Sequence, residues 1–402
     1  MRNNLRPYDN FRVALTQPRD FFGRSSLISA VQRSPFQVRI LLGGRRLGKS
    51  SALNVLRASL LDSGKGESSR AFPVLFNLQQ EQPKSLEHLR YLLIARLQEA
   101  MRQHKESAMS GWRKSYRRLL RQIPGGQIEI GLPKVGLKLN LTNPDHERRL
   151  IHEDFRQDLL KLLKQIQKQN FEGICFFLDG AEFIVSQDWA NDAWSYLRSL
   201  KDSDIALKPF LGFLLSGYRD LKDYQQRVGS PLLNIAEVEW LGVLTQSETR
   251  ALIAQRSNDE QIYLTDEQID WVIKWAGGHP YLTQQILNTL FDEQVKDKPR
   301  SPESLMRYLI RQHDRDFSSW WQEKQRSYSF DKTEQAVYLA LVKQRKGTAE
   351  TLVPQTSLSL GEIADALEIL AGTGVILKVD DEQYEIGARL FENWVSHQTS
   401  YR

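Results

Sequence analysis

Cysteine is almost absent from this sequence. Its 402 residues include a single one, Cys175, so no disulfide can form within the chain. Cys175 lies in the apolar run ICFFLDG, which we expect to be a buried strand. A chain without internal disulfides is typical of a reducing compartment. We therefore expect a cytoplasmic protein.

Long hydrophobic runs are absent as well. No window approaches the roughly 18 uninterrupted apolar residues of a membrane-spanning helix. The first residues, MRNNLRPYDN, lack the apolar segment of a signal peptide. The content of 41% hydrophobic and 26% charged residues is ordinary for a globular protein. Because no membrane-spanning run is present, we expect no membrane partner. The length exceeds that of one ordinary core, so we expect two or three domains.

The chain has no large excess of either charge. Its 55 Lys and Arg against 49 Asp and Glu give a net charge of +6. This value permits contact with nucleic acid without requiring it. The basic excess concentrates in residues 102–122, RQHKESAMSGWRKSYRRLLRQ, where aromatic residues are interleaved. Such a segment is either a solvent-exposed helix face, which we favour, or a surface for a polyanion.

One stretch carries recognisable chemistry. Residues 40–56, ILLGGRRLGKSSALNVL, contain the pattern G-x-x-x-x-G-K-[ST] between a strand expected at 36–42 and a helix expected at 49–61. In this pattern glycines aim backbone N–H groups at phosphate oxygens, the lysine reaches the β- and γ-phosphates, and the hydroxyl binds Mg²⁺. We therefore predict a P-loop. Its nucleotide-binding residues would be Gly43, Gly44, Arg45, Arg46, Leu47, Gly48, Lys49, Ser50 and Ser51.

A P-loop needs an acid on a neighbouring strand. In residues 171–185, FEGICFFLDGAEFIV, a continuous apolar run ends at Asp179. Ligands bind at the carboxyl ends of strands in open α/β sheets, so we expect Asp179 and Ser50 to hold Mg²⁺. The alternative is a strand-end acid that caps a loop. Many ATPases have a glutamate after this aspartate, whereas this chain has Gly180, with Glu182 two positions further on. Either Glu182 substitutes imperfectly or hydrolysis is slow, and we favour slow hydrolysis.

A third buried strand is predicted within residues 208–221, KPFLGFLLSGYRDL. Its apolar core ends at Ser216, where a polar side chain can sense the γ-phosphate. Arg219, just beyond, either supplies positive charge in cis or to a neighbouring subunit, or is a surface residue paired with a nearby acid. With a further strand at 71–79, these segments predict an α/β fold, a doubly wound parallel sheet with helices on both faces.

The rest of the chain predicts two more domains. Capping boxes and the Gly277–Gly278 helix stop indicate a helical lid. Helices followed by a hairpin then give the order of a winged helix. Its second helix carries acids and no basic residue, so it more readily packs on protein than reads DNA. The expected domains are a lead-in at 1–35, a P-loop core at 36–239, a lid at 240–325 and a winged-helix domain at 326–402. The core includes a hairpin-like insert at 125–143, for which we find no chemistry.

With these motifs placed, the chain resembles the AAA+ P-loop ATPases, especially prokaryotic members of the STAND and archaeal-initiator-like branch. The similarity runs from PYDNFRVALTQPRDFFGR (7–24) through GGRRLGKSS, FFLDGAEF and LLSGYRDL to AGGHPYLTQQIL, most of the chain. It implies that the backbone at Phe22, Gly23 and Arg24 lies against the adenine and that Pro280 contacts the base. Without the resemblance, residues 277–280 are a plain helix-breaking turn.

The resemblance implies a nucleotide-dependent switch, closed with ADP and assembled with ATP. We expect a slow ATPase with ATP or ADP and Mg²⁺ as cofactors, which self-associates in the ATP state and acts with a separate protein effector or sensor in signalling or defence. Its candidate catalytic residues are Lys49, Asp179, Glu182, Ser216 and Arg219. The alternatives are a DNA-binding ATPase of the initiator or transposition-regulator kind, with nucleic acid not favoured, and a scaffold that binds ATP only for structure.

Overall fold

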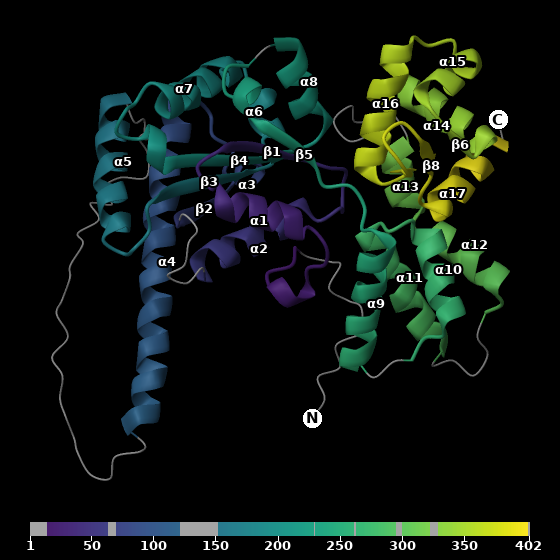
Figure 1. Ribbon diagram of the computed structural model, residues 1–402, viewed down its shortest axis with the longest axis horizontal. Helices are drawn as coiled ribbons and strands as arrows, with labels where there is room; N and C mark the ends of the chain where they lie inside the picture. Colours follow the sequence, from purple (N-terminus) through teal and green to yellow (C-terminus); the bar gives the residue numbers. More distant parts are fainter. Residues whose placement is uncertain are drawn as a thin grey trace.

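The computed structural model describes residues 14–62, 70–120, 152–228, 230–260, 263–294, 300–321 and 329–400. Figure 1 shows a sheet domain on one side and two groups of elements on the other, residues 246–321 and residues 332–400. The insert expected at 125–143 lies outside the described residues.

A parallel sheet forms the centre of the first domain. Its five strands have the order β2-β3-β4-β1-β5, and every neighbouring pair is parallel. The strands are β1 (Val38–Leu42), β2 (Ala71–Asn77), β3 (Gly173–Asp179), β4 (Leu211–Gly217) and β5 (Glu237–Trp240). The inner strands β3 and β4 are apolar along almost their whole length, as expected when helices cover both faces. The doubly wound parallel sheet predicted from the sequence is confirmed.

Each face of the sheet has its own apolar core. One core lies under α1 (Ser25–Arg33) and α2 (Lys49–Asp62) and includes Cys175. The other lies under α4 (Leu86–Leu120), α5 (His152–Gln167) and α7 (Ala190–Asp202). Cys175 is buried as predicted, and burial raises the pKa of its thiol to about 12, so it stays protonated.

Helix α4 projects beyond the sheet (Figure 1). It continues to Leu120, so the basic segment 102–122 begins as an extension of a core helix. Of the side chains that the structure describes there, Arg102 pairs with Glu99 and lies 3.6 Å from Glu106.

After β5 the chain forms helices. The lid region contains α9 (Gln246–Glu260), α10 (Asp266–Ala276), α11 (Pro280–Gln294), α12 (Pro302–Gln312) and α13 (Asp314–Trp321). The predicted capping box at Thr265 and Gln268 is present at the start of α10. Gly277 ends this helix in a left-handed conformation (φ 60°). This conformation disfavours a side chain, which explains why the position is a glycine.

The C-terminal domain has the predicted order of helices followed by a hairpin. It consists of α14 (Lys332–Gln344), β6 (Lys346–Gly347), α15 (Ala349–Thr356), α16 (Leu360–Thr373), β7 (Ile376–Lys378), β8 (Tyr384–Ile386) and α17 (Arg389–Ser400). The lid helices and this domain share one apolar core. In it Phe317 and Trp320 of α13 pack against Phe391 of α17, with ring centroids 5.4 and 5.6 Å apart. Lid and C-terminal domain are therefore one packed body.

Candidate functional site: a nucleotide pocket

The loop between β1 and α2 has the geometry of a phosphate cradle. Helix α2 begins at Lys49, so its unpaired N–H groups and the positive end of its dipole lie at the loop. Gly48 has a φ of 97°, a conformation that favours glycine, and Arg46 is also left-handed at 63°. The backbone thus supplies anion-binding donors where the sequence predicts them.

Lys49 is folded against its own loop. Its Nζ donates to the carbonyl oxygens of Gly43, at 2.6 Å, and Gly44, at 3.0 Å. Burial lowers the pKa of Lys49, while the negative charges of Glu182 and Asp179 act in the opposite direction. A desolvated cation held by two neutral carbonyls gains much more from a phosphate, so this side chain is poised for an anion.

Three segments meet at Asp179. The Ser50 hydroxyl donates to its Oδ2 at 2.8 Å, and the Ser216 hydroxyl donates to its Oδ1. The backbone N–H of Gly180 donates to the Ser216 oxygen at 3.2 Å, which fixes that hydroxyl at the end of β4. A hydroxyl and a carboxylate side by side are hard oxygen donors of the kind that Mg²⁺ prefers. The residues present therefore fit a Mg²⁺ ion.

Gly180 and Glu182, which follow Asp179 in the sequence, lie in different surroundings. Gly180 has a φ of 76°, and a Cβ there would lie 2.9 Å from the Gln79 side chain, so the structure is built for glycine. Glu182 begins the short helix α6 (Glu182–Val185) and is buried. Burial raises the pKa of Glu182, with Lys49 opposing, and its Oε2 has no hydrogen-bond partner among the described residues. A buried, unsatisfied carboxyl thus lies close to the phosphate-binding loop.

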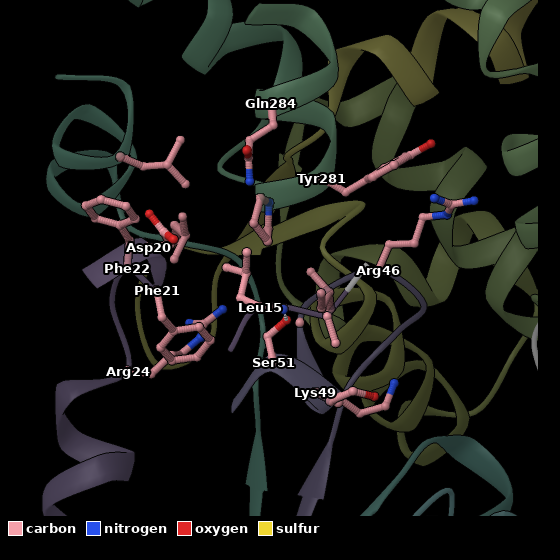
Figure 2. Close-up of a pocket in the computed structure, with 17 residues that line it drawn as sticks. Leu15, Asp20, Phe21, Phe22, Arg24, Arg46, Lys49, Ser51, Tyr281 and Gln284 are labelled. Atoms are coloured by element: carbon pink, nitrogen blue, oxygen red, sulfur yellow. Dashed lines mark hydrogen bonds between the residues drawn. The ribbon is translucent and has the colours of Figure 1, made fainter. Parts of the chain in front are cut away.

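A cavity of about 260 Å³ extends from the P-loop toward the lid. Figure 2 shows Lys49 at one end, Tyr281 and Gln284 of α11 at the other, and Phe21, Phe22 and Arg24 of the N-terminal segment along one side. The structure brings Phe22, Arg24 and Pro280 to this cavity, as the resemblance implies. Its other lining residues were not predicted individually from the sequence and include Leu15, Asp20, Leu244, Leu252, Tyr281 and Gln284.

The N-terminal segment is held against the P-loop helix. The backbone N–H of Leu15 donates to Ser51 Oγ at 2.9 Å, and Asn54 Nδ2 donates to the Leu15 carbonyl at 3.1 Å. The Arg24 guanidinium donates to the carbonyls of Gly242, at 2.7 Å, and Val243, at 3.0 Å. Arg24 therefore anchors the link between sheet and lid and also lines the cavity.

Arg46 connects the P-loop to the lid. Its guanidinium lies over the Tyr281 ring, 4.3 Å from the centroid, and 3.2 Å from Asp316 Oδ1. The Tyr281 hydroxyl donates to the other Asp316 oxygen at 2.8 Å. The loop, α11 and α13 are thus joined by one group of contacts beside the cavity.

Arg219 lies at the domain interface. It begins α8 (Arg219–Val228), is buried, and pairs with Glu334 of α14 in the C-terminal domain. Burial raises the pKa of Glu334 to about 7, with Arg219 opposing. Its ion-pair partner Glu334 is 115 positions away in the sequence.

The acids of α16 face the P-loop domain. Lys222 of α8 lies 2.5 Å from Glu368 Oε2, and the Trp240 indole donates to Glu368 Oε1 at 2.7 Å. Asp365 lies 4.0 Å from Lys222. The helix that would read DNA in a winged helix therefore packs on protein, which agrees with its acidic sequence.

The C-terminal end of α16 rests on the P-loop itself. The Gly44 N–H donates to the Gly372 carbonyl at 3.0 Å. A Cβ at Gly44 would lie 2.9 Å from the Thr373 Cα, and a Cβ at Gly372 would overlap the Trp240 ring. Glycine at both positions is what allows the two backbones to approach.

Comparisons with known proteins agree with this architecture. No family model matches the sequence, and no curated protein matches it either. Among solved structures the chain is similar to the Walker-type ATPase PABY2304 of Pyrococcus abyssi, with a TM-score of 0.57 and 14% identity over 97% of this chain and 99% of that one. The chain has the fold of a P-loop NTPase.

Two proteins of Aeropyrum pernix are also similar. Its ORC2 protein, in ADPNP–ADP complexes, has a TM-score of 0.47 and 11% identity over 99% of this chain and 97% of that one. Its ORC1 protein, in complex with DNA, has a TM-score of 0.41 and 12% identity over 94% and 93%. Separately, no helix among the described residues is long and apolar enough to cross a membrane.

Proposed function

We propose that this chain is an Mg-ATP-binding switch with slow hydrolysis, whose nucleotide state determines whether the C-terminal domain rests on the P-loop. The observation that carries the proposal is the hydrogen bond from Gly44 to Gly372, next to the carbonyls that hold Lys49. A domain that contacts the phosphate-binding loop must respond when phosphates change that loop.

The nucleotide site follows from the loop geometry. The phosphates would lie at the start of α2, where Lys49 exchanges its carbonyl partners for β- and γ-phosphate oxygens. Ser50 and Asp179 would hold Mg²⁺, which when bound neutralises charge on the phosphates. The base would enter the lid end of the cavity, near Phe22 and Pro280.

Slow turnover follows from the surroundings of Asp179. The position that usually carries a water-orienting glutamate is Gly180, which the backbone and Gln79 keep free of a side chain. Glu182 lies two positions further on, where it begins helix α6 and is buried, so it does not occupy the usual position of the glutamate. We therefore propose that water is activated weakly here.

The switch uses the end of β4. Ser216 touches Asp179, and Arg219 three positions later touches Glu334 of the C-terminal domain. A γ-phosphate beside Ser216 would attract the Arg219 guanidinium, and to reach the phosphate Arg219 would have to break its ion pair with Glu334. We propose that this competition releases the C-terminal domain, exposes surface for self-association and allows a separate effector protein to bind.

Light scattering coupled to size exclusion tests the proposal. We expect a monomer with Mg-ADP and a defined larger assembly with Mg-ATP. Calorimetry on the same sample measures nucleotide affinity directly. A chain that binds no adenine nucleotide refutes the proposal, and one that binds ATP without a change of mass or of domain docking refutes the switch but leaves the site.

A further inference from the structure

The lid end of the nucleotide cavity is apolar with few polar side chains. Phe22, Leu244, Leu252 and Pro280 supply most of its wall. Gln284, one turn after Pro280 on α11, is an exception. Figure 2 shows its carboxamide reaching from the helix toward the cavity, on the side away from Lys49.

Gln284 is almost fully buried and incompletely bonded. Only 5% of the residue is exposed, and its side-chain oxygen has no hydrogen-bond partner among the described residues. A buried polar atom left without a partner is unfavourable, so such atoms are usually matched by something that enters the site. The position of Gln284 at a ligand cavity indicates that its partner is part of the ligand.

Two other polar side chains that line the cavity near this end, Tyr281 and Asp20, are held from outside it, and the Tyr281 hydroxyl donates to Asp316. Asp20 lies 3.6 Å from Arg256 of α9, and the same turn is fastened by Gln255, whose Nε2 donates to the Arg19 carbonyl at 2.8 Å. Asp20 therefore already has a cation beside it. Gln284 is the neutral group that can face a base edge with both an acceptor and a donor.

A glutamine carboxamide matches the N7 edge of adenine and not that of guanine. On this edge adenine places its 6-amino donor beside the N7 acceptor, and a glutamine pairs with both at once. On the same edge guanine has two acceptors, its 6-carbonyl oxygen and N7, so no orientation of the carboxamide pairs with both and the amide oxygen stays unpaired. We propose that Gln284 selects adenine, its oxygen accepting a hydrogen bond from the 6-amino group. The proposal rests on the proposed function, because it names the base-reading residue of the same site.

Calorimetric titration with ATP, GTP and purine riboside triphosphate, which lacks the 6-amino group, tests this role. We expect the unchanged chain to bind ATP about 10-fold or more tighter than either of the other two. Gln284→Met keeps the length of the side chain and removes both hydrogen-bonding atoms, so it should bring the three affinities close together. Gln284→Glu keeps an acceptor and should keep the preference for ATP over purine riboside triphosphate.

Asn288→Leu is the matched control. Asn288 lies one turn further along α11, is 6% exposed, and is not among the residues that line the cavity. We expect this variant to keep the ratio of ATP to GTP affinity. A general loss of packing in α11 would affect both variants alike, so a ratio that changes only in Gln284→Met indicates base selection. If Gln284→Met retains the wild-type ratios, or if the unchanged chain binds all three nucleotides equally, Gln284 is not the selector although the nucleotide site stands. If the unchanged chain binds none of them, both proposals fail.

Discussion

Gly372→Ala should lift the C-terminal domain from the P-loop. An alanine in a helix normally stabilises it by about 1 kcal/mol relative to glycine. At this position, however, the added Cβ overlaps the Trp240 ring, which is itself held by Glu368. Overpacking of this kind costs about 1–3 kcal/mol, so the undocked population should rise by about 5- to 150-fold.

Amide hydrogen exchange measures this population directly. The Gly44 N–H is hydrogen-bonded to Gly372 in the docked form, so exchange at Gly44, read from a peptide that covers residues 43–48, should accelerate by the same factor. Exchange in β4 should not change, because its hydrogen bonds lie within the sheet. This difference separates undocking from general unfolding.

Gly361→Ala provides the control within the same helix. A Cβ at Gly361 meets nothing within 4 Å, so this variant gains helix propensity without a clash. It should leave exchange at the P-loop unchanged. If Gly372→Ala and Gly361→Ala give the same exchange at residues 43–48, the reasoning about docking is wrong.

Three further predictions concern the site and the interface. Lys49→Ala should abolish ATP binding in calorimetry, because the phosphates lose the cation that the loop holds for them; unchanged affinity would contradict the P-loop assignment. Gly180→Glu should lower the midpoint of thermal unfolding, because a side chain is strained at a φ of 76° and its Cβ would lie against Gln79. The same variant should speed phosphate release if a missing acid limits turnover. Equal or slower release would leave Glu182 or a partner's residue as the base. The thermal unfolding midpoint of the wild type, measured relative to that of Glu334→Gln, should fall as the pH rises from about 4.5 to about 7. The pKa of Glu334 is raised in the folded state, so its contribution to stability is complete below its ordinary pKa and is lost as the pH rises through its folded-state pKa. A difference in midpoint that does not depend on pH would show that Glu334 is not buried beside Arg219.

The arrangement of the candidate site's residues could be predicted because its parts follow local rules. The glycine loop, the strand before it and the helix after it are continuous in sequence, and Asp179 and Ser216 end apolar strands. Parallel strands bring their carboxyl ends to one edge, so the meeting of Ser50, Asp179 and Ser216 follows from the order of elements alone.

Contacts between distant segments could not be predicted in the same way. Arg219 has acids close by in sequence, yet its partner Glu334 belongs to another domain. Gly372 sits within a helix, and no local pattern distinguishes it from Gly361, although one meets Trp240 and the other meets nothing. Gln284 is one polar residue in an ordinary amphipathic helix, and only its place in the cavity gives it a role.

The shared core of the lid and the C-terminal domain also sets how the molecule can open. Two elements that pack as one body cannot leave the sheet domain separately, so they must rotate together about the connection after β5. Gly242 lies in that connection with a φ of 52°, and a Cβ there would meet nothing within 4 Å, so we expect the hinge at this residue. Because Leu252 and Pro280 of this body also line the cavity, the same movement that uncovers the P-loop would open the cavity. Nucleotide exchange and domain release would therefore share one rate.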